Sequence, residues 1–417
     1  MNGSKGFVDP PENAPAGDAF YTPPVPLPEG HVGDSIYQRK LDDPVVALAQ
    51  GRNWLVLYRS EDARDNPIAV SGIIALPKEP PQAGGYPLIT WAHGTVGVAH
   101  ECAPSRDHDR AGAHPMNRYP HTLLNHFLDQ GWAVAMTDYE GLGVTDRTHP
   151  YMLGASEARG VLDIVHTARR LFPGQIAERY AIVGHSQGGQ AALFAAHHAP
   201  ERTDNLVGVA AIAPANHTFE VVQAGALWPG FSEGYAFTPM FLCGAMGGDP
   251  TIEPEQVLSI NAIKYWPQVA ERCRAGLSES DSWGGKVTGN NQFRLGYLSS
   301  PNSDQENFNA QLREMNPALR IGVPIRIAQS ADDDRVPPVT VREIPDLADI
   351  TIPGTNALVD ELRDTNQESE PELLYRFYDE GEVEVPAPDP GDLGAHFATI
   401  NHDLPALTAW LEGLLTT

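Results

Sequence analysis

The sequence predicts an α/β fold in which helices cover both faces of a mostly parallel central sheet. Short runs rich in β-branched residues alternate with segments whose apolar residues recur at helical spacing. Several of these runs are continuously apolar, as is typical of strands buried inside a parallel sheet. The alternation is interrupted once, over residues 216–315, and then resumes. This pattern indicates one large α/β domain that carries an insertion.

The N-terminal part combines a surface segment with the first strands. Residues 1–45 are rich in proline and glycine and are expected to wrap the surface. The polar stretch EDARDNP separates the first two strands and indicates a hairpin connection. The strands expected in this part lie at 54–60, 68–77, 87–94 and 132–141.

Helices and strands alternate in the middle of the chain. Residues 155–172 carry apolar positions at helical spacing and basic residues near the end, which predicts a helix. A strand is expected at 179–186, a helix at 190–199 and another buried strand at 207–215. Strands that alternate with helices in this way favour a parallel sheet covered on both faces.

Residues 216–315 place many large apolar side chains among glycine, proline and serine without regular alternation. We expect this stretch to form an inserted cap, so that the α/β core consists of residues 46–215 and 316–417. The second part of the core is expected to hold strands at 323–330 and 372–379. The chain should end in an amphipathic helix entered near Pro405.

The charge of the chain argues against a nucleic-acid partner, and its hydropathy argues against a membrane-spanning segment. Lys and Arg total 28 against 54 Asp and Glu, which gives a net charge of −26. Nucleic-acid binding relies on clustered basic residues, so no nucleic-acid partner is expected. No stretch approaches the roughly 18–20 apolar residues that span a bilayer. Residues 1–20 contain no apolar segment typical of a signal peptide, which predicts either an intracellular protein or a chain numbered from a processed or engineered form.

The main functional signal is the motif Gly184-His185-Ser186-Gln187-Gly188. An apolar strand precedes it and an alanine-rich helix follows it. In α/β-hydrolases a serine at such a turn projects its Oγ above the sheet, and the flanking glycines avoid steric clashes. The motif predicts an α/β-hydrolase fold with Ser186 as nucleophile, and the alternative is an ordinary strand-to-helix turn.

A nucleophilic serine needs a general base, and the base needs an orienting carboxylate. In this fold the acid follows a later strand and the base comes after the acid. The strand at 323–330 runs into the sequence ADDDRVPP, where the spacing D-x-x-V-P favours Asp333. Asp332 and Asp334 remain alternatives, with turn formation and solvation as their other role.

Two histidines follow the acid. His396 lies in a glycine-containing segment between the last expected strand and the last expected helix, where a catalytic base belongs. His402 lies at the expected entrance of that helix, where capping or solvent contact would explain it. The sequence therefore favours His396 as the base.

Two backbone N–H groups should form an oxyanion hole. One is expected from Gln187, the residue after the nucleophile, and the other from Thr95 in the sequence His93-Gly94-Thr95. His93 is expected to hold this loop in place.

The cysteine count leaves two interpretations open. Three cysteines are too few for a disulfide scaffold, and their spacing does not suit a metal site. All three could be buried thiols, or Cys102 could pair with Cys273 and leave Cys243 as a core thiol.

Several segments together resemble the secretory lipase family typified by Candida antarctica lipase A, with its bacterial relatives. The elbow at Ser186, the acid loop at Asp333 and His396 ahead of the sequence PALTAWL match that family. The other segments that carry the resemblance are AFYTPPVPLPEGHVGDSIY near the start, CAPS at 102–105, DYEGLG at 138–143 and HPY at 149–151.

The resemblance implies an α/β-hydrolase whose cap is inserted between nucleophile and acid and encloses the acyl-binding pocket. It makes a Cys102–Cys273 bridge conceivable, and it suggests a secreted or periplasmic protein. The family's second disulfide cannot form from three cysteines.

These features predict a carboxylic ester hydrolase that works through an acyl-enzyme, with no metal and no organic cofactor. The substrate is expected to be a small-molecule or lipid ester with a short- to medium-chain acyl group. Alternatives are a triglyceride lipase with an interfacial lid, or an acyltransferase or peptidase that uses the same triad. A non-catalytic binding protein is disfavoured because all three triad residue types are present.

Overall fold

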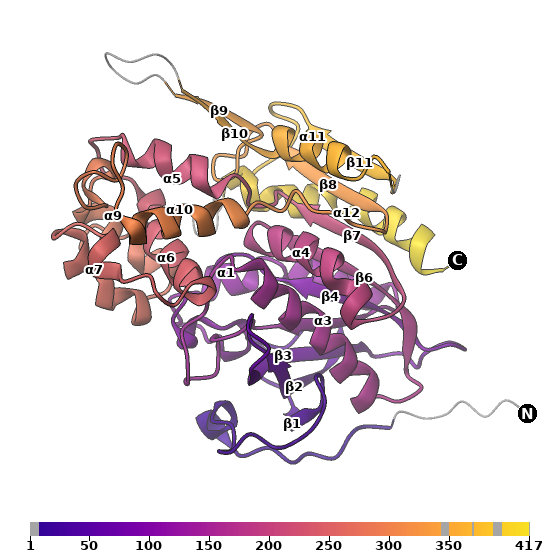
Figure 1. Cartoon of the computed structure of the whole chain (residues 1–417). Coiled ribbons are helices and arrows are strands. Elements are labelled where there is room, and N and C mark those ends of the chain that lie inside the picture. The colour runs from indigo at the N-terminus through magenta and orange to yellow at the C-terminus, as the bar shows by residue number, and fades with distance from the viewer. Residues whose placement is uncertain (1–7, 343–349, 369–370, 387–393, 417) are drawn as a thin grey trace, which may run out of the picture.

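The computed structural model describes residues 8–342, 350–368, 371–386 and 394–416. Within these residues, nine strands form one sheet in the order β1-β2-β3-β5-β4-β6-β7-β8-β11 (Figure 1). The strands from β5 across to β11 run parallel, whereas the pairings of β1 with β2, β2 with β3 and β3 with β5 are antiparallel. The predicted α/β architecture with a mostly parallel sheet is confirmed.

The strands of this sheet are β1 (Ser35–Lys40), β2 (Gly51–Glu61), β3 (Pro67–Pro77), β4 (Tyr86–Ala92), β5 (Ala133–Thr137), β6 (Ile176–His185), β7 (Leu206–Ile212), β8 (Ile325–Ser330) and β11 (Leu373–Tyr378). A separate antiparallel pair consists of β9 (Val339–Arg342) and β10 (Ile350–Pro353). The helices are α1 (His114–Arg118), α2 (His121–Asp129), α3 (Gly154–Leu171), α4 (Gln187–Arg202), α5 (Thr218–Ala226), α6 (Phe237–Gly248), α7 (Pro254–Val257), α8 (Arg274–Ser278), α9 (Trp283–Lys286), α10 (Ser303–Glu314), α11 (Thr355–Thr365) and α12 (Gly394–Leu415).

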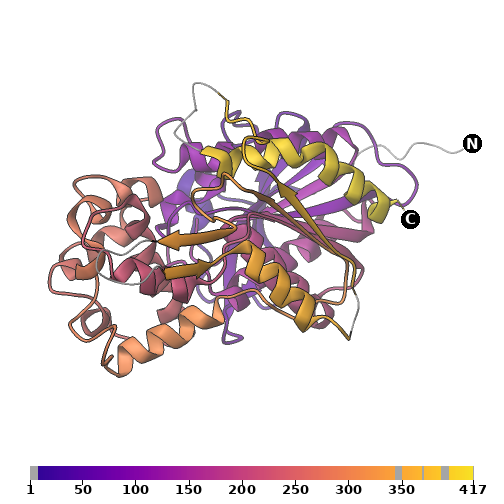
Figure 2. The same cartoon turned by 90° about the horizontal axis from the view of Figure 1, so that it is seen from above.

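Helices cover both faces of the sheet, with α11 and α12 on opposite sides (Figure 2). The apolar side chains of α3, α4 and α11 share one core cluster, and those of α2 and α12 share another. The strands supply alternate residues to the two clusters, because successive side chains of a strand point to opposite faces. In β2, Trp54, Val56 and Tyr58 join the first cluster, whereas Leu55 and Leu57 join the second.

The segment expected to form a cap, 216–315, lies between β7 and β8 and folds as α5 to α10 with intervening loops. These elements gather beside the sheet rather than over one of its faces (Figures 1 and 2). Their apolar side chains form a third core cluster, which also includes Val98, Tyr151 and Met152 from the α/β part. The packing of these three residues joins the cap segment to the loops that follow β4 and β5.

The expectation that residues 1–45 only wrap the surface missed β1. This strand pairs with β2 and forms one edge of the sheet. Its sequence, SIYQRK, offers two large apolar residues, and most of its side chains are half-buried. A strand with so little hydrophobic periodicity is held mainly by its backbone pairing, which the local pattern does not reveal.

The prediction that the last helix is entered near Pro405 was wrong, because α12 begins at Gly394 and contains this proline. Proline removes one backbone hydrogen bond and normally breaks a helix. Here Phe397 and Ile400 before it and Leu407 and Leu411 after it are all buried at helical spacing. The packing of that continuous apolar face outweighs the cost of the proline. His396 therefore lies in the first turn of a helix and not in a loop.

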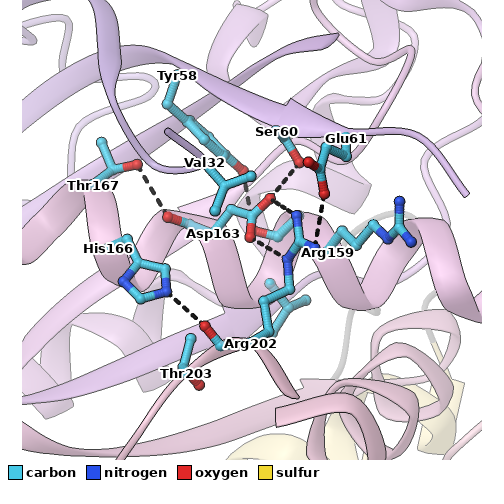
Figure 3. A network of polar contacts seen from close by, with 12 residues as sticks. Val32, Tyr58, Ser60, Glu61, Arg159, Asp163, His166, Thr167, Arg202 and Thr203 are labelled. Atoms are coloured by element: carbon cyan, nitrogen blue, oxygen red, sulfur yellow. Dashed lines mark hydrogen bonds and ion pairs between the residues drawn. The ribbon is translucent and has the colours of Figure 1, made fainter. Parts of the chain in front are cut away.

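A polar network fixes the C-terminal end of α4, the helix that follows Ser186 (Figure 3). The Arg202 guanidinium donates to both carboxylate oxygens of Asp163 in α3, at 2.5 and 2.8 Å. Arg202 also donates to Glu61 at 3.1 Å, and the hydroxyl of Ser60 donates to Asp163 at 2.6 Å. The network therefore links α3, α4 and β2.

Cys102 and Cys273 form a disulfide, and Cys243 is a buried free thiol. Of the two interpretations left open by the sequence, the structure has the one that pairs Cys102 with Cys273. Among the described helices, none combines the length and the apolar character needed to cross a bilayer.

Candidate active site

Ser186 occupies a strained turn between β6 and α4. Its φ and ψ are 58° and −121°, a conformation that is costly for a residue with a side chain. Four backbone hydrogen bonds hold the turn: the Ser186 N–H donates to Ile212, and the Ser186 carbonyl accepts from Gly189, Gln190 and Ala215. The strain is thus maintained by the surrounding backbone, as expected of a functional residue.

Two glycines make this turn sterically possible. A Cβ on Gly184 would lie 1.9 Å from the carbonyl oxygen of Gly188, and a Cβ on Gly188 would lie 1.9 Å from that of Ala92. Backbone atoms at such distances cannot move aside without displacing β4 or α4. The glycines of the motif are therefore required by the close approach of three chain segments.

His396 and Asp333 are hydrogen-bonded to each other, with His396 Nδ1 2.7 Å from Asp333 Oδ2. Both side chains are buried. Asp333 Oδ1 accepts from the backbone N–H groups of Arg335 and Val336, and Oδ2 also accepts from Gln329 Nε2 at 3.2 Å. These contacts fix the carboxylate, and the carboxylate in turn fixes the orientation of the imidazole. Nδ1 faces Asp333, so Nε2 is the ring nitrogen that remains for other contacts.

The alternative acid and base residues take no part in this hydrogen bond. Asp332 accepts a hydrogen bond from the Gly381 N–H, and Asp334 is exposed. The ring of His402 stands edge-on to Tyr378, and its Nε2 is 3.9 Å from Glu382. In the described part of the chain, the His396 ring instead contacts Asp333, His185 and Phe397.

Tyr119 connects the loop at 93–95 to His185, which in turn contacts His396. Its Oη accepts from the Gly94 N–H at 3.1 Å and lies 3.1 Å from His185 Nδ1, while His185 Nε2 is 3.0 Å from the carbonyl oxygen of His396. A carbonyl oxygen can only accept, so His185 carries its proton on Nε2 and the Tyr119 hydroxyl donates to Nδ1. Burial, together with the nearby His396, holds the pKa of His185 well below its usual range, so His185 stays neutral.

The two residues expected to supply the oxyanion hole are held by buried side chains. Thr95 Oγ1 is 2.7 Å from the hydroxyl of Tyr151. Gln187 is the first residue of α4, where backbone N–H groups lack carbonyl partners within the helix. Its side-chain amide donates to Glu157 Oε1 at 2.6 Å and lies 3.0 Å from His149 Nε2. These side-chain contacts hold Thr95 and Gln187 in place, and with them their backbone N–H groups.

His93 supports the same loop. Its Nδ1 is 2.7 Å from the carbonyl oxygen of Gly94, and its ring lies against Tyr139. Burial lowers the pKa of His93 to about 4, so the imidazole is neutral near pH 7.

Ser186, His396 and Thr95 line one cavity of about 520 Å³. The cavity lies between the α/β part and the cap segment, since both contribute to its wall. Residues from the cap segment in this wall include Val221, Val222, Tyr235, Phe237, Phe241 and Arg274. Among the described residues, no group of three or more His, Cys, Asp or Glu side chains is placed to hold a metal ion.

Sequence reasoning missed four residues around the site: Tyr119, Gln329, Tyr151 and Arg274. Three of them contact partners distant in the chain; Tyr119, for example, contacts His185, 66 positions away. Gln329 instead donates to Asp333, only four positions away. Tyr151 belongs to the HPY segment that carries the family resemblance, which was its one available signal. For the other three, a single sequence offers no local pattern that distinguishes them from core or surface residues.

Comparisons with known proteins agree with this fold. Residues 110–239 match the sequence profile of the alpha/beta hydrolase fold family. The rice cell wall degrading esterase LipA from Xanthomonas oryzae has a similar crystal structure, with a TM-score of 0.68 at 18% identity over 93% of this chain and 99% of that one. Candida antarctica lipase A in its closed state gives a TM-score of 0.64 at 14% identity, over 85% of this chain and 78% of that one. This chain has the α/β-hydrolase fold.

The α/β-hydrolase fold explains why residues far apart in the chain lie at the same edge of the sheet. Ser186 and Asp333 follow the carboxyl ends of β6 and β8, which lie on either side of β7 in the parallel part of the sheet. Ligands of open α/β sheets bind outside these ends.

Sequence similarity to curated proteins points to lipases. Lipase 7 of Candida albicans is 30% identical over 207 residues, which cover 47% of this chain and 46% of that protein. Lipase 6 of the same yeast is 27% identical over 211 residues and 43% of its length. The chain therefore spans about half the length of the curated relatives that it matches. The resemblance to lipases of this kind is confirmed by these similarities.

Proposed function

We propose that this protein is a serine carboxylic ester hydrolase in which Ser186, His396 and Asp333 form the catalytic triad. The observation that carries the proposal is the 2.7 Å hydrogen bond between Asp333 and His396, in a cavity wall that also contains Ser186 at its strained turn. The similarity to lipases and esterases supports it further.

In this mechanism Ser186 Oγ attacks the ester carbonyl while His396 Nε2 takes its proton. The backbone N–H groups of Gln187 and Thr95 stabilise the negative charge that develops on the carbonyl oxygen. His396 then protonates the leaving alcohol, and an acyl-enzyme remains on Ser186. Water, deprotonated by the same imidazole, attacks the acyl carbon and releases the carboxylic acid.

Asp333 acts by orienting His396 and by stabilising the imidazolium that forms during each step. Its carboxylate is already bonded to two backbone N–H groups and to Gln329, so it cannot turn away from the imidazole without losing these contacts. A cavity of about 520 Å³, with apolar cap residues in its wall, supports short- to medium-chain acyl groups as substrates.

Replacement of the triad residues tests the proposal. With p-nitrophenyl butyrate, Ser186→Ala should lose at least about three orders of magnitude in turnover, and Asp333→Asn and His396→Ala should also be severely impaired. The chain offers matched controls: Ser303→Ala for the serine, Asp332→Asn for the acid and His402→Ala for the base. These exposed or half-exposed residues lie outside the cavity wall.

A covalent label provides a second readout. Diethyl p-nitrophenyl phosphate should modify one serine per chain, and peptide mass spectrometry should find the added phosphoryl group on Ser186. Retained esterase turnover in pure Ser186→Ala, or a severe loss in His402→Ala with activity preserved in His396→Ala, would contradict the assignment.

A further inference from the structure

Arg274 is a buried cation in the wall of the cavity that contains Ser186. Its relative exposure is 8%, and it is the first residue of α8 in the cap segment. The charged or ionisable groups that act on its guanidinium are Arg335, Glu233 and Tyr151, and all three also line this cavity. The guanidinium is therefore surrounded by groups of the cavity wall.

The backbone at Arg274 is tied to the loop that carries Thr95. The Arg274 N–H donates to the carbonyl oxygen of Val96 at 2.9 Å, and Cys273 forms an isolated β-bridge with Gly97. The disulfide from Cys273 to Cys102 adds a covalent link at the same place. Arg274 is thus held in a fixed position close to the expected oxyanion hole.

No carboxylate of the described residues forms an ion pair with Arg274. Its guanidinium carbon lies 5.5 Å from the centroid of the Phe237 ring, and its Nε has no hydrogen-bond partner among the described residues. Burial, with a smaller contribution from Arg335, lowers the pKa of Arg274 to about 10, so the group remains charged near pH 7. A buried charge without a counter-charge is costly, and proteins rarely keep one without a function.

The carboxylates in the described wall of this cavity are solvated. Glu233 and Asp334 line the same cavity, but both are exposed. Water screens an exposed carboxylate and weakens its attraction for a buried guanidinium. An anionic ligand inside the cavity would lack that screening, and its carboxylate would match the planar fork of donors that a guanidinium offers.

We propose that the ester cleaved by this protein carries a carboxylate in its acyl or alcohol part, and that Arg274 binds this carboxylate. The inference rests on the proposed esterase function and specifies its substrate class. Hydrolysis of a monoester of a dicarboxylic acid, whose free carboxyl is ionised, would consume one water and release a dicarboxylate, an alcohol and a proton.

Two pairs of esters test the proposal and separate the two parts of the substrate. On the acyl side, p-nitrophenyl hydrogen glutarate is compared with p-nitrophenyl pentanoate. On the alcohol side, 4-butanoyloxybenzoate is compared with 4-butanoyloxybenzamide. The ratio of kcat/KM for the charged ester to that for the neutral ester is measured in about 0.5 M NaCl, which screens the long-range repulsion from the chain's net negative charge.

In the wild-type protein at least one pair should give a ratio above one. Arg274→Gln should lower that ratio by about ten- to a hundredfold, because only the charged ester offers the carboxylate that Arg274 binds. Arg274→Lys should restore part of the ratio because it keeps the charge. The matched control is Arg272→Gln, two positions away, whose guanidinium pairs with Asp281 outside the cavity wall.

A ratio that Arg274→Gln leaves unchanged in both pairs would overturn the proposal. A wild-type ratio below one in both pairs would overturn it without any variant, and this measurement decides the matter if Arg274→Gln does not fold. Failure of the proposed function has a different signature, since neither the charged nor the neutral esters would then be hydrolysed in a way that depends on Ser186.

Discussion

Two buried arginines of this molecule have opposite surroundings. Arg326 in β8 donates from both terminal nitrogens to Asp403 in α12, each at 2.6 Å, and Tyr378 donates to the same carboxylate. Arg274 in the cavity wall has no such carboxylate among the described residues. In the core the chain supplies the counter-charge itself, so the charge serves the fold. In the cavity, by our proposal, a bound ligand supplies the counter-charge. The difference distinguishes Arg326, whose charge stabilises the fold, from Arg274, whose charge binds a ligand.

Removal of the counter-charge in the core should have the largest effect on stability. Asp403→Asn leaves the Arg326 guanidinium buried without its anion, and we expect a loss of about 3–5 kcal/mol in the free energy of unfolding. Urea unfolding followed by circular dichroism measures it. The control is Asp360→Asn, which breaks an exposed pair with Arg363 and should cost less than about 1 kcal/mol.

The same measurement on Arg274→Gln sharpens the contrast. Because this substitution removes a buried charge whose attracting carboxylate, Glu233, is exposed, the free energy of unfolding should fall by less than about 1 kcal/mol or rise. A loss as large as that of Asp403→Asn would mean that Arg274 has a structural partner, and it would remove the distinction between the two arginines.

His93, a buried histidine with a lowered pKa, should make the free energy of unfolding depend on pH. The pKa of His93 is about 4 in the folded protein, below its usual value of 6.5. Above pH 6.5 the imidazole is neutral in both states, and its contribution to stability is fully present. As the pH falls below 6.5 the unfolded chain takes up the proton first, so stability is lost progressively until the pH passes below about 4.

At pH 5 this loss amounts to about 2 kcal/mol relative to pH 7. His93→Gln retains a donor for the Gly94 carbonyl and cannot titrate, so its free energy of unfolding should fall less over the same range. His402→Gln changes a partly exposed histidine and should follow the wild type. Parallel curves for wild type and His93→Gln between pH 7 and 5 would show that His93 is not buried as a neutral group.

The sequence was sufficient where the fold depends on local pattern and chain order. β6, the turn at Ser186 and α4 follow from an apolar run, flanking glycines and an alanine-rich helix, and the acid follows its strand as the fold requires. The prediction failed at α12, because burial of an apolar face on both sides of Pro405 outweighs the local preference of proline. Arg274 could not be foreseen, since its place beside the loop that carries Thr95 depends on a disulfide and a β-bridge between distant segments.

The smallest expected effect concerns Tyr119, a positioning residue whose hydroxyl joins Gly94 to His185. It thereby links the loop at 93–95 to the segment that carries His396. Tyr119→Phe removes these two hydrogen bonds and leaves the ring packing in place. A loss of about 1 kcal/mol in transition-state stabilisation corresponds to about a fivefold fall in kcat with little change in KM. The control is Tyr375→Phe, which removes a hydroxyl bonded to Asn356 away from the cavity. An equal fall in kcat in both variants, or a change confined to KM, would contradict this role. The Tyr119 hydroxyl would then position neither His396 nor the loop at 93–95, and its two hydrogen bonds would serve stability alone.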